Sequence, residues 1–396
     1  MNKQKYIDLF ESNLNSAIDL WLTRSPDREH GGIYHCLDRD GNIFSRDKGV
    51  WMQGRAGWTF SYLYNHYQPR PEFLEIAKSC IDFAREKCTD TDGRMYVKVT
   101  KDGAPLEKSG EWFSEAFYIM ACAEYYNATG DRDYLYEARV TYDLILAIFR
   151  DPSVDPYKVS HGGSQMARPT RHFNQPMILL NVGSVMAACD PERISLYNEN
   201  ALWLGGLIRD FFKEEYGGTL ESIAPDGSVI LDAATERVCC PGHDMECAWF
   251  LLEEGRRLGN TEMCSLAARM FDCAYAMGLD REYGGILYYR DILPYPVEAY
   301  EQDMKIWWVH NEAIIASLAL FCDTGSDLYR EIFEKTVEYS FARFVDSDGE
   351  WYATLRRDGV PNETMIKGFI YKGPFHTLRM YVRCLEMLRG AKADLV

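Results

Sequence analysis

A motif built around glycine recurs six times along this chain, and it limits the possible folds more than any other feature. Its copies are Glu29-His-Gly-Gly-Ile-Tyr34, Asp92-Gly-Arg-Met-Tyr96, His161-Gly-Gly163, Glu215-Tyr-Gly-Gly-Thr-Leu220, Glu282-Tyr-Gly-Gly-Ile-Leu-Tyr288 and Asp348-Gly-Glu-Trp-Tyr352. The last glycines of successive copies are 61, 70, 55, 67 and 64 residues apart. Six copies at a near-constant period indicate a repeat architecture, and the turn residues in each copy predict a short hairpin.

The segments between these motifs carry helical patterns. In residues 326–344, for example, apolar side chains form one stripe and charged side chains lie opposite, which is typical of an amphipathic helix. The sequence predicts twelve helices, at 3–22, 50–66, 71–88, 111–128, 132–150, 173–189, 193–213, 241–258, 260–277, 305–322, 326–344 and 373–390.

Six helix–hairpin–helix units predict an all-α fold, an (α/α)6 barrel with short β-hairpins in the connecting loops. An open solenoid is the alternative. The even-numbered helices are expected on the inside because they carry few charges, as in Ala313–Leu320, whereas the odd-numbered helices carry the charge pattern of an exposed face. Residues 1–396 are expected to form a single domain.

Composition excludes several classes of partner. A formal net charge of −17 argues against binding to nucleic acid or to an anionic membrane surface. The 12 cysteines are scattered without CxxC spacing, which favours buried thiols in a reducing compartment over disulfides or a metal site. No stretch is apolar enough for a signal core or a membrane span, so a cytoplasmic protein is expected.

Polar and aromatic residues gather where the even-numbered helices begin. In a closed ring with parallel inner helices, these helix ends meet at one mouth and form a small-molecule pocket. First-turn glutamates are also favoured by the helix dipole alone, and tryptophans also serve as core packing. Arg55 is harder to explain structurally, because a guanidinium inside an apolar helix needs a polar partner.

His243 and His376 occupy similar places in two repeats and suggest a pair of proton-transfer groups facing one cavity. A glycoside hydrolase is a rival interpretation, since two glutamates could form an acid/base pair. The candidate glutamates are Glu111, Glu115, Glu246 and Glu312. A sugar-binding or protein-binding module is a third interpretation, and it requires no opposed histidines.

Five motifs together resemble the N-acylglucosamine 2-epimerase family, in order and along nearly the whole chain. They are Trp51-Met-Gln-Gly-Arg55, Gln175-Pro-Met-Ile-Leu-Leu-Asn181, Pro241-Gly-His-Asp-Met-Glu246, Trp307-Trp-Val-His-Asn-Glu-Ala313 and Lys372-Gly-Pro-Phe-His376. The resemblance implies an (α/α)6 barrel that interconverts N-acetylglucosamine and N-acetylmannosamine, or that epimerises or isomerises aldoses such as cellobiose or mannose. The histidine in Trp-Trp-x-His-x-Glu-Ala is more similar to the N-acylglucosamine branch, because the cellobiose branch usually has glutamine there.

The resemblance also implies a mechanism and its residues. A base removes the C2 proton of the open-chain sugar to give an enediolate, and an acid returns a proton to the opposite face. The implied catalytic residues are His243, His376, Arg55, which would stabilise charge on O1, and Glu246. The implied substrate-binding residues are Trp51, Glu115, Asn181, Trp308, His310, Glu312 and Arg379. No cofactor or metal is required, a nucleotide such as ATP is a candidate allosteric activator, and a homodimer is expected.

Overall fold

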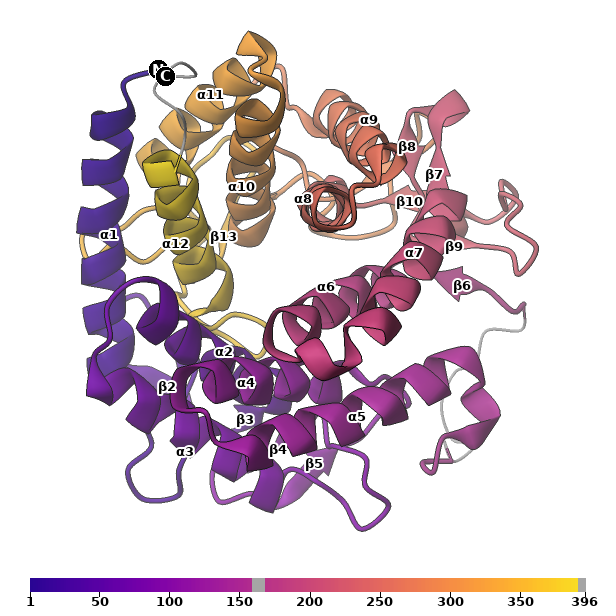
Figure 1. The fold of residues 1–396 in the computed structure, drawn as a ribbon. Helices are drawn as coiled ribbons and strands as arrows, with labels where there is room; N and C mark the ends of the chain where they lie inside the picture. The colour runs from indigo at the N-terminus through magenta and orange to yellow at the C-terminus, as the bar shows by residue number, and fades with distance from the viewer. Residues whose placement is uncertain (159–167, 391–396) are drawn as a thin grey trace.

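The computed structural model describes residues 1–158 and 168–390 and shows helices arranged in a ring (Figure 1). Within these residues there are twelve α-helices. They are α1 (Lys3–Arg24), α2 (Val50–His66), α3 (Pro71–Lys87), α4 (Phe113–Thr129), α5 (Arg132–Arg150), α6 (Asn174–Cys189), α7 (Ile194–Phe211), α8 (Pro241–Leu258), α9 (Thr261–Gly278), α10 (Trp307–Thr324), α11 (Asp327–Arg343) and α12 (Phe375–Gly390). Four short 3₁₀ helices complete the helical part, η1 (Pro152–Val154), η2 (Pro191–Arg193), η3 (Glu214–Tyr216) and η4 (Ala234–Arg237).

The even-numbered helices form a closed inner ring. Each packs on the next, from α2 to α4, α6, α8, α10 and α12, and α12 packs back on α2. The odd-numbered helices lie outside them, and α1 packs on α12 (Figure 1). The predicted (α/α)6 barrel is therefore confirmed, and the predicted helix ends differ from the observed ones by at most two residues.

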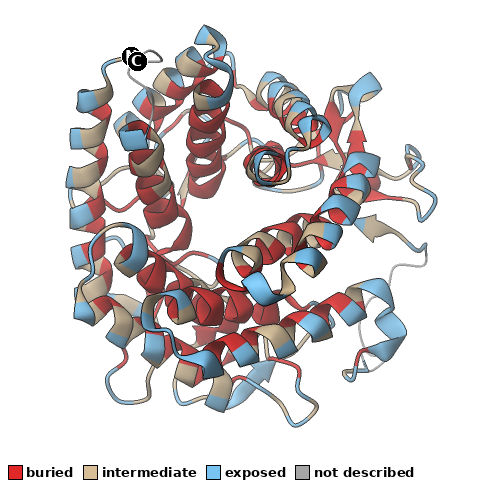
Figure 2. Cartoon of the chain, in the orientation of Figure 1, coloured by how far each residue is buried: buried red, intermediate tan, exposed pale blue. Residues whose placement is uncertain are grey.

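Burial separates the two rings (Figure 2). Every residue from Trp307 to Phe321 of α10 is buried, as expected for a helix that is apolar on all sides. The outer helix α11 instead buries one stripe, made of Tyr329, Ile332, Phe333, Thr336, Val337 and Ser340. In the described ranges, no helix combines the length and the apolar character needed to span a membrane.

The strands are only two or three residues long and lie in the loops at one end of the barrel. Within repeats, β1 (Cys36–Leu37) pairs with β2 (Ile43–Ser45), β4 (Lys98–Val99) with β5 (Pro105–Glu107), and β7 (Phe212–Lys213) with β8 (Gly218–Thr219). Between repeats, β3 (Lys48–Gly49) pairs with β4, β6 (Arg171–His172) with β9 (Ser222–Ile223), β10 (Val238–Cys239) with β11 (Arg290–Asp291), and β12 (Lys305–Ile306) with β13 (Thr354–Leu355). The predicted isolated hairpins are thus joined to their neighbours, and the third motif copy, 161–163, lies outside the described residues.

Buried ion pairs fix these loops to the inner helices. Just before α2, Lys48 Nζ lies 2.7 Å from Asp27 Oδ2, and just before α10, Lys305 Nζ lies 2.6 Å from Asp280 Oδ2. Both lysine side chains are fully buried, so each needs the carboxylate it contacts. The same device therefore anchors the start of an inner helix in two different repeats.

Candidate active site

A cavity of about 840 Å³ opens at the end of the barrel where the inner helices begin. This volume is typical of small-molecule sites, which measure about 300–1,000 Å³. All six inner helices contribute to its lining, together with the loops near residues 300 and 360. Its aromatic lining consists of Trp51, Phe113, Phe117, Tyr288, Tyr300, Trp307, Trp308, Phe369 and Tyr371.

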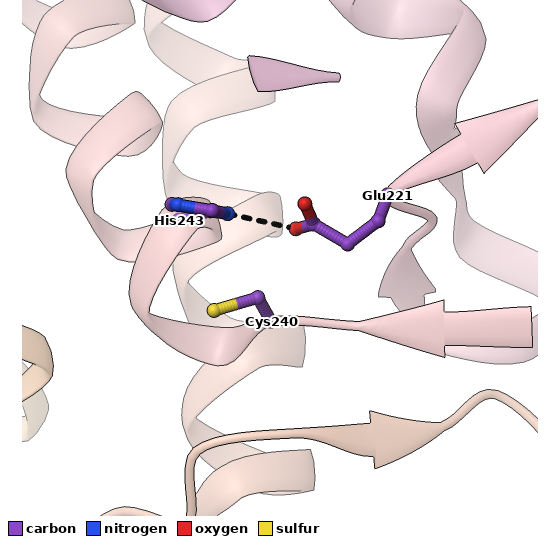
Figure 3. A group of neighbouring side chains, drawn as sticks. All are labelled: Glu221, Cys240 and His243. Carbon is purple, nitrogen blue, oxygen red and sulfur yellow. Dashed lines mark hydrogen bonds and ion pairs between the residues drawn. The ribbon is translucent and has the colours of Figure 1, made fainter. Parts of the chain in front are cut away.

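His243 lines this cavity from the first turn of α8. A Cβ at the preceding residue, Gly242, would lie 2.7 Å from atoms of Trp308, so the glycine lets α8 begin in close contact with α10. His243 Nδ1 donates a hydrogen bond to Glu221 Oε1 at 2.9 Å (Figure 3). The carboxylate fixes the ring orientation and leaves the second nitrogen, Nε2, for a ligand in the cavity.

His376 lines the same cavity from the first turn of α12 and is only 6% exposed. Its Nδ1 donates to Glu312 Oε1 at 2.8 Å, while Glu312 Oε2 accepts a hydrogen bond from Trp249 Nε1 at 2.8 Å. The indole of Trp308 lies against both imidazoles, with ring centroids 5.0 Å from His243 and 5.8 Å from His376. The two histidines therefore contact the same aromatic side chain, and each is held at Nδ1 by a glutamate.

Arg379 connects the inner helices behind the cavity. Its Nη2 lies 2.6 Å from Glu246 Oε1 and 2.8 Å from Glu312 Oε1. All three side chains are buried, so the guanidinium compensates two carboxylates that could not otherwise remain charged there. This contact ties α12 to α8 and α10 and fixes the glutamate that orients His376.

The two imidazoles have opposite proton affinities. Burial alone would lower the pKa of His243, but the charge of Glu221, followed by the charge of Cys240 and hydrogen bonds to both residues, raises that pKa well above the usual range. Burial, followed by the positive charges of Arg55 and Arg379, lowers the pKa of His376 well below its ordinary value. The two pKa shifts have opposite directions, which suits a pair of groups that act as acid and base.

Arg55 reaches the cavity from the second turn of α2. A Cβ at the adjacent Gly54 would lie 2.7 Å from the backbone of Phe117, so the glycine allows α2 and α4 to pack closely. The guanidinium carbon lies 4.1 Å from the Phe117 ring centroid and 4.9 Å from that of Phe375. Burial lowers the pKa of Arg55 to about 9, and its Nε has no hydrogen-bond partner in the described part of the chain. Its donors are available to an oxygen atom of a bound ligand.

A model of the N-acylglucosamine 2-epimerase (GlcNAc 2-epimerase) family matches residues 32–376, a range that contains both cavity histidines and the glutamates that hold them. The chain belongs to the N-acylglucosamine 2-epimerase family. It is accordingly an enzyme of the isomerase class, and the family resemblance predicted from its motifs is confirmed.

Individual relatives from this epimerase family and its neighbours agree with that assignment. The N-acylglucosamine 2-epimerase of Bos taurus is 33% identical over 392 residues, which cover 97% of this chain and 91% of the bovine protein. The cellobiose 2-epimerase of Eubacterium cellulosolvens is 23% identical and covers 92% of this chain and 93% of its own length. The structure of cellobiose 2-epimerase from Bacillus thermoamylovorans B4167 superposes with a TM-score of 0.83 at 19% identity, covering 97% of this chain and 99% of that one, and so shares the fold.

The epimerase fold brings most of the predicted site residues together. Six of them line the cavity, namely Trp51, Arg55, His243, Glu246, Trp308 and His376. Glu312 and Arg379 lie directly behind His376. Asn181 instead lines a second cavity of about 480 Å³, formed by later turns of the inner helices, and Arg379 contributes to that cavity as well.

Two predicted sugar-binding residues, Glu115 and His310, do not line the cavity. Glu115 accepts hydrogen bonds from the backbone N–H of Met95 at 2.8 Å and from Arg94 Nε at 2.7 Å. His310 Nε2 accepts from the backbone N–H of Ile286 at 3.0 Å, and its Nδ1 donates to the carbonyl of its own helix start at 2.9 Å. Their placement does not support contact with a sugar, because both side chains are used to hold the glycine motif.

This arrangement is a repeat feature. In the first repeat, Gln53 of α2 accepts from the backbone N–H of Ile33 at 2.9 Å, just as Glu115 accepts from Met95 and His310 from Ile286. The N–H belongs to the residue directly after the last glycine in the copies that contain Ile33 and Ile286, and to the second residue after it in the copy that contains Met95. A polar side chain early in an inner helix therefore has a structural role that can be mistaken for catalysis.

The hydrolase interpretation receives no support from the carboxylates on which it was based. Of the four glutamates considered for it, only Glu246 lines the cavity, and its carboxylate is bound by Arg379. Glu115 and Glu312 are held behind the cavity wall by other contacts. No acid/base pair of these glutamates therefore faces the cavity across the described residues.

Glu221 was not predicted from the sequence. It stands three residues after the last glycine of its motif copy, where four other copies have His35, Tyr96, Tyr288 and Tyr352. An alignment of the copies would have shown one acidic residue at an otherwise aromatic position. The sequence has no run of residues with the spacing of metal ligands, so two clusters that form only in space were not predicted. Glu221, Cys240 and His243 form one set of potential metal ligands, and Glu246, Glu312 and His376 form another.

Proposed function

We propose that this enzyme interconverts N-acetyl-D-glucosamine and N-acetyl-D-mannosamine. The main support is that His243 and His376 line one cavity and both contact Trp308, each held at Nδ1 by a glutamate. The choice of sugar is supported by the relatives, since the bovine N-acylglucosamine 2-epimerase is 33% identical and the Eubacterium cellobiose 2-epimerase only 23%.

The proposed reaction exchanges the proton on C2 of the open-chain sugar. The neutral imidazole takes the C2 proton, and the electron pair of the C–H bond moves to the carbonyl oxygen O1 to form an enediolate. The protonated imidazole then gives a proton to the opposite face of C2, and the O1 charge returns as a carbonyl. In the reverse direction the two histidines exchange roles, so each turnover leaves them ready for the reverse reaction.

Arg55 is the proposed partner of O1. Its Nε has no protein hydrogen bond, its side chain lines the cavity, and a fixed cation near O1 stabilises the negative charge of the enediolate. Glu246 and Arg379 are proposed to keep Glu312, and through it His376, in one orientation. Glu246 also reaches the cavity, where it can accept a hydrogen bond from a sugar hydroxyl.

An apolar wall of the cavity supports an N-acylated substrate. Phe113 and Phe117 of α4 and Met177 and Ile178 of α6 line one part of it. The methyl group of an N-acetyl substituent would be removed from water by such a wall, whereas a hydroxyl there would lose its hydrogen bonds. We therefore place the acetamido group between α4 and α6.

The test is proton NMR of N-acetylmannosamine with the enzyme in deuterated water. N-acetylglucosamine carrying deuterium at C2 is expected with the wild type, and loss of both product and exchange with His243→Ala and His376→Ala. His310→Gln is the matched control, because His310 also belongs to an inner helix but does not line the cavity. Deuterium exchange with cellobiose or mannose alone would identify those sugars as the substrates. A ketose product with deuterium at C1 would indicate an aldose–ketose isomerase. No exchange with any sugar would refute the proposal.

We also propose a cytoplasmic homodimer that needs no cofactor. All twelve cysteines are free, which suits a reducing compartment. Light scattering after gel filtration tests the dimer, and full activity after dialysis against a chelator tests the absence of a metal requirement. Activation by a nucleotide is tested by adding ATP to the same assay, and an unchanged rate would refute it.

A further inference from the structure

We propose that Glu221, Cys240 and His243 form an inhibitory binding site for a thiophilic divalent cation such as Zn²⁺. One ligand atom from each residue lies within 4.8 Å of the other two (Figure 3). The inference that metal binding would stop catalysis rests on the proposed role of His243 in proton transfer. Metal binding by the three side chains does not depend on that role.

The three side chains are held by well-defined backbone. Glu221 lies between β8 and β9, and its backbone N–H donates to the carbonyl of Val238 at 2.9 Å. Cys240 directly precedes α8 and accepts a backbone hydrogen bond from Asp244 at 3.2 Å. His243 is the third residue of that helix. The ligands come from two paired loop segments and one helix start, so a metal would need little rearrangement of the chain.

The donor set selects the class of cation. One thiolate, one imidazole and one carboxylate are ligands that Zn²⁺ accepts in tetrahedral sites with a fourth position left open. Mg²⁺ and Ca²⁺ require more oxygen ligands than this cluster offers. The other cluster, Glu246, Glu312 and His376, differs because the guanidinium of Arg379 already bridges its two carboxylates.

Binding would displace two protons into solvent, the proton that His243 Nδ1 donates to Glu221 and the thiol proton of Cys240. With the metal on Nδ1, the imidazole keeps a single proton on Nε2 and can neither accept a second one nor release that one readily. His243 would then be lost from proton transfer. Glu221 and Cys240 do not line the cavity, so the bound metal would lower kcat with little change in KM.

Binding is tested first, without reference to activity. Metal-free wild-type enzyme is expected to bind one Zn²⁺ per chain in equilibrium dialysis, and Co²⁺ as a spectroscopic probe is expected to give a near-ultraviolet thiolate charge-transfer band. Cys240→Ser should lose this band and bind Zn²⁺ about 10–100-fold more weakly. Cys240→Ala serves as a second variant, and circular dichroism establishes that each variant is folded.

Cys264→Ser is the matched control, because Cys264 is a partly exposed thiol on the neighbouring helix α9 and outside the cluster. It should behave as the wild type. Equal Zn²⁺ affinity and an unchanged cobalt band in Cys240→Ser would overturn the site. Binding that depends on Cys240 but leaves kcat for N-acetylmannosamine unchanged would overturn the inhibition. An enzyme inactive on every sugar that still shows Cys240-dependent binding would refute the proposed function and leave the metal site supported.

Discussion

His310 has a structural role that distinguishes it from the proposed catalytic pair, His243 and His376, and its replacement tests this distinction. The imidazole is fully buried, burial lowers its pKa to about 3, and among the described residues its Nε2 is the one acceptor for the backbone N–H of Ile286. Because Ile286 N–H is a donor, Nε2 must be unprotonated and Nδ1 must carry the proton that it donates to Ile306 O. The imidazole also stacks on the Tyr339 ring, with centroids 5.5 Å apart, and contacts the Phe344 ring, with centroids 4.8 Å apart.

His310→Ala should destabilise the fold by about 2–5 kcal/mol. A buried N–H without an acceptor costs about 1–3 kcal/mol, and loss of the packed ring adds about 1–2 kcal/mol. With an unfolding entropy of about 2.1 cal/mol/K per residue, a chain of this length should lose about 2–6 °C in Tm. His310→Gln should lose about 1 °C, because Gln53 performs the same task for Ile33 in the first repeat.

Thermal denaturation and steady-state epimerisation of N-acetylmannosamine provide the assay. The kcat/KM of His310→Gln should stay within about threefold of the wild type, since less than about 0.7 kcal/mol of transition-state stabilisation is involved. His376→Ala should show the reverse, an activity loss of about 100-fold or more with a modest change in Tm. A His310→Gln variant with unchanged Tm and an activity loss of that size would refute the structural assignment.

Three further predictions follow from buried charges. Arg55→Met should lower kcat/KM by about 100-fold through loss of charge stabilisation at O1, while Arg55→Lys should recover part of that loss; equal rates for both variants and the wild type would contradict the role of Arg55. Glu115→Ala should lower the free energy of unfolding in urea by about 1–3 kcal/mol, because the backbone N–H of Met95 loses its acceptor and Arg94 keeps only Asp155 as a carboxylate partner, with kcat retained in the folded fraction; a selective loss of kcat would contradict this. Burial would raise the pKa of Asp27, but hydrogen bonds from Lys48 and others lower it to about 2. Because this folded-state pKa lies below the ordinary aspartate value of 3.8, the resulting stability of about 2 kcal/mol is fully present above about pH 4 and is lost as the pH falls to 2. Acid titration of Asp27→Asn should lack that component.

The helices could be read from the sequence because burial there follows the helical period. The outer helix α11, expected at 326–344 and observed at Asp327–Arg343, buries one stripe, and the inner helix α10 buries every side. Both patterns are local, so no knowledge of neighbouring segments was needed. The paired loops were predicted less well, because strands such as β10 and β11 join different repeats and their partners lie about 50 residues apart.

The cavity lining was predicted where a residue stands at the start of an inner helix, as with His243 and His376. The partners of these residues were not predicted where they are distant in the chain. Glu221 lies 22 residues before His243, and Arg379 lies 133 residues after Glu246, so neither contact has a local signal. Conversely, Glu115 and His310 have the polar character of site residues, and only the backbone N–H groups that they bind reveal their structural role.

The ring closes with its last helix, and this has a consequence for synthesis of the chain. α12 supplies His376, Arg379 and the contact with α2, and the buried pair of Lys372 and Glu350 lies just before it. Until this helix has left the ribosome, the carboxylates of Glu246 and Glu312 lack the guanidinium that compensates them, and the cavity lacks one of its two proposed proton-transfer groups. We therefore expect chains truncated before α12 to be inert towards sugars, with epimerase activity beginning only when translation has reached the end of the barrel.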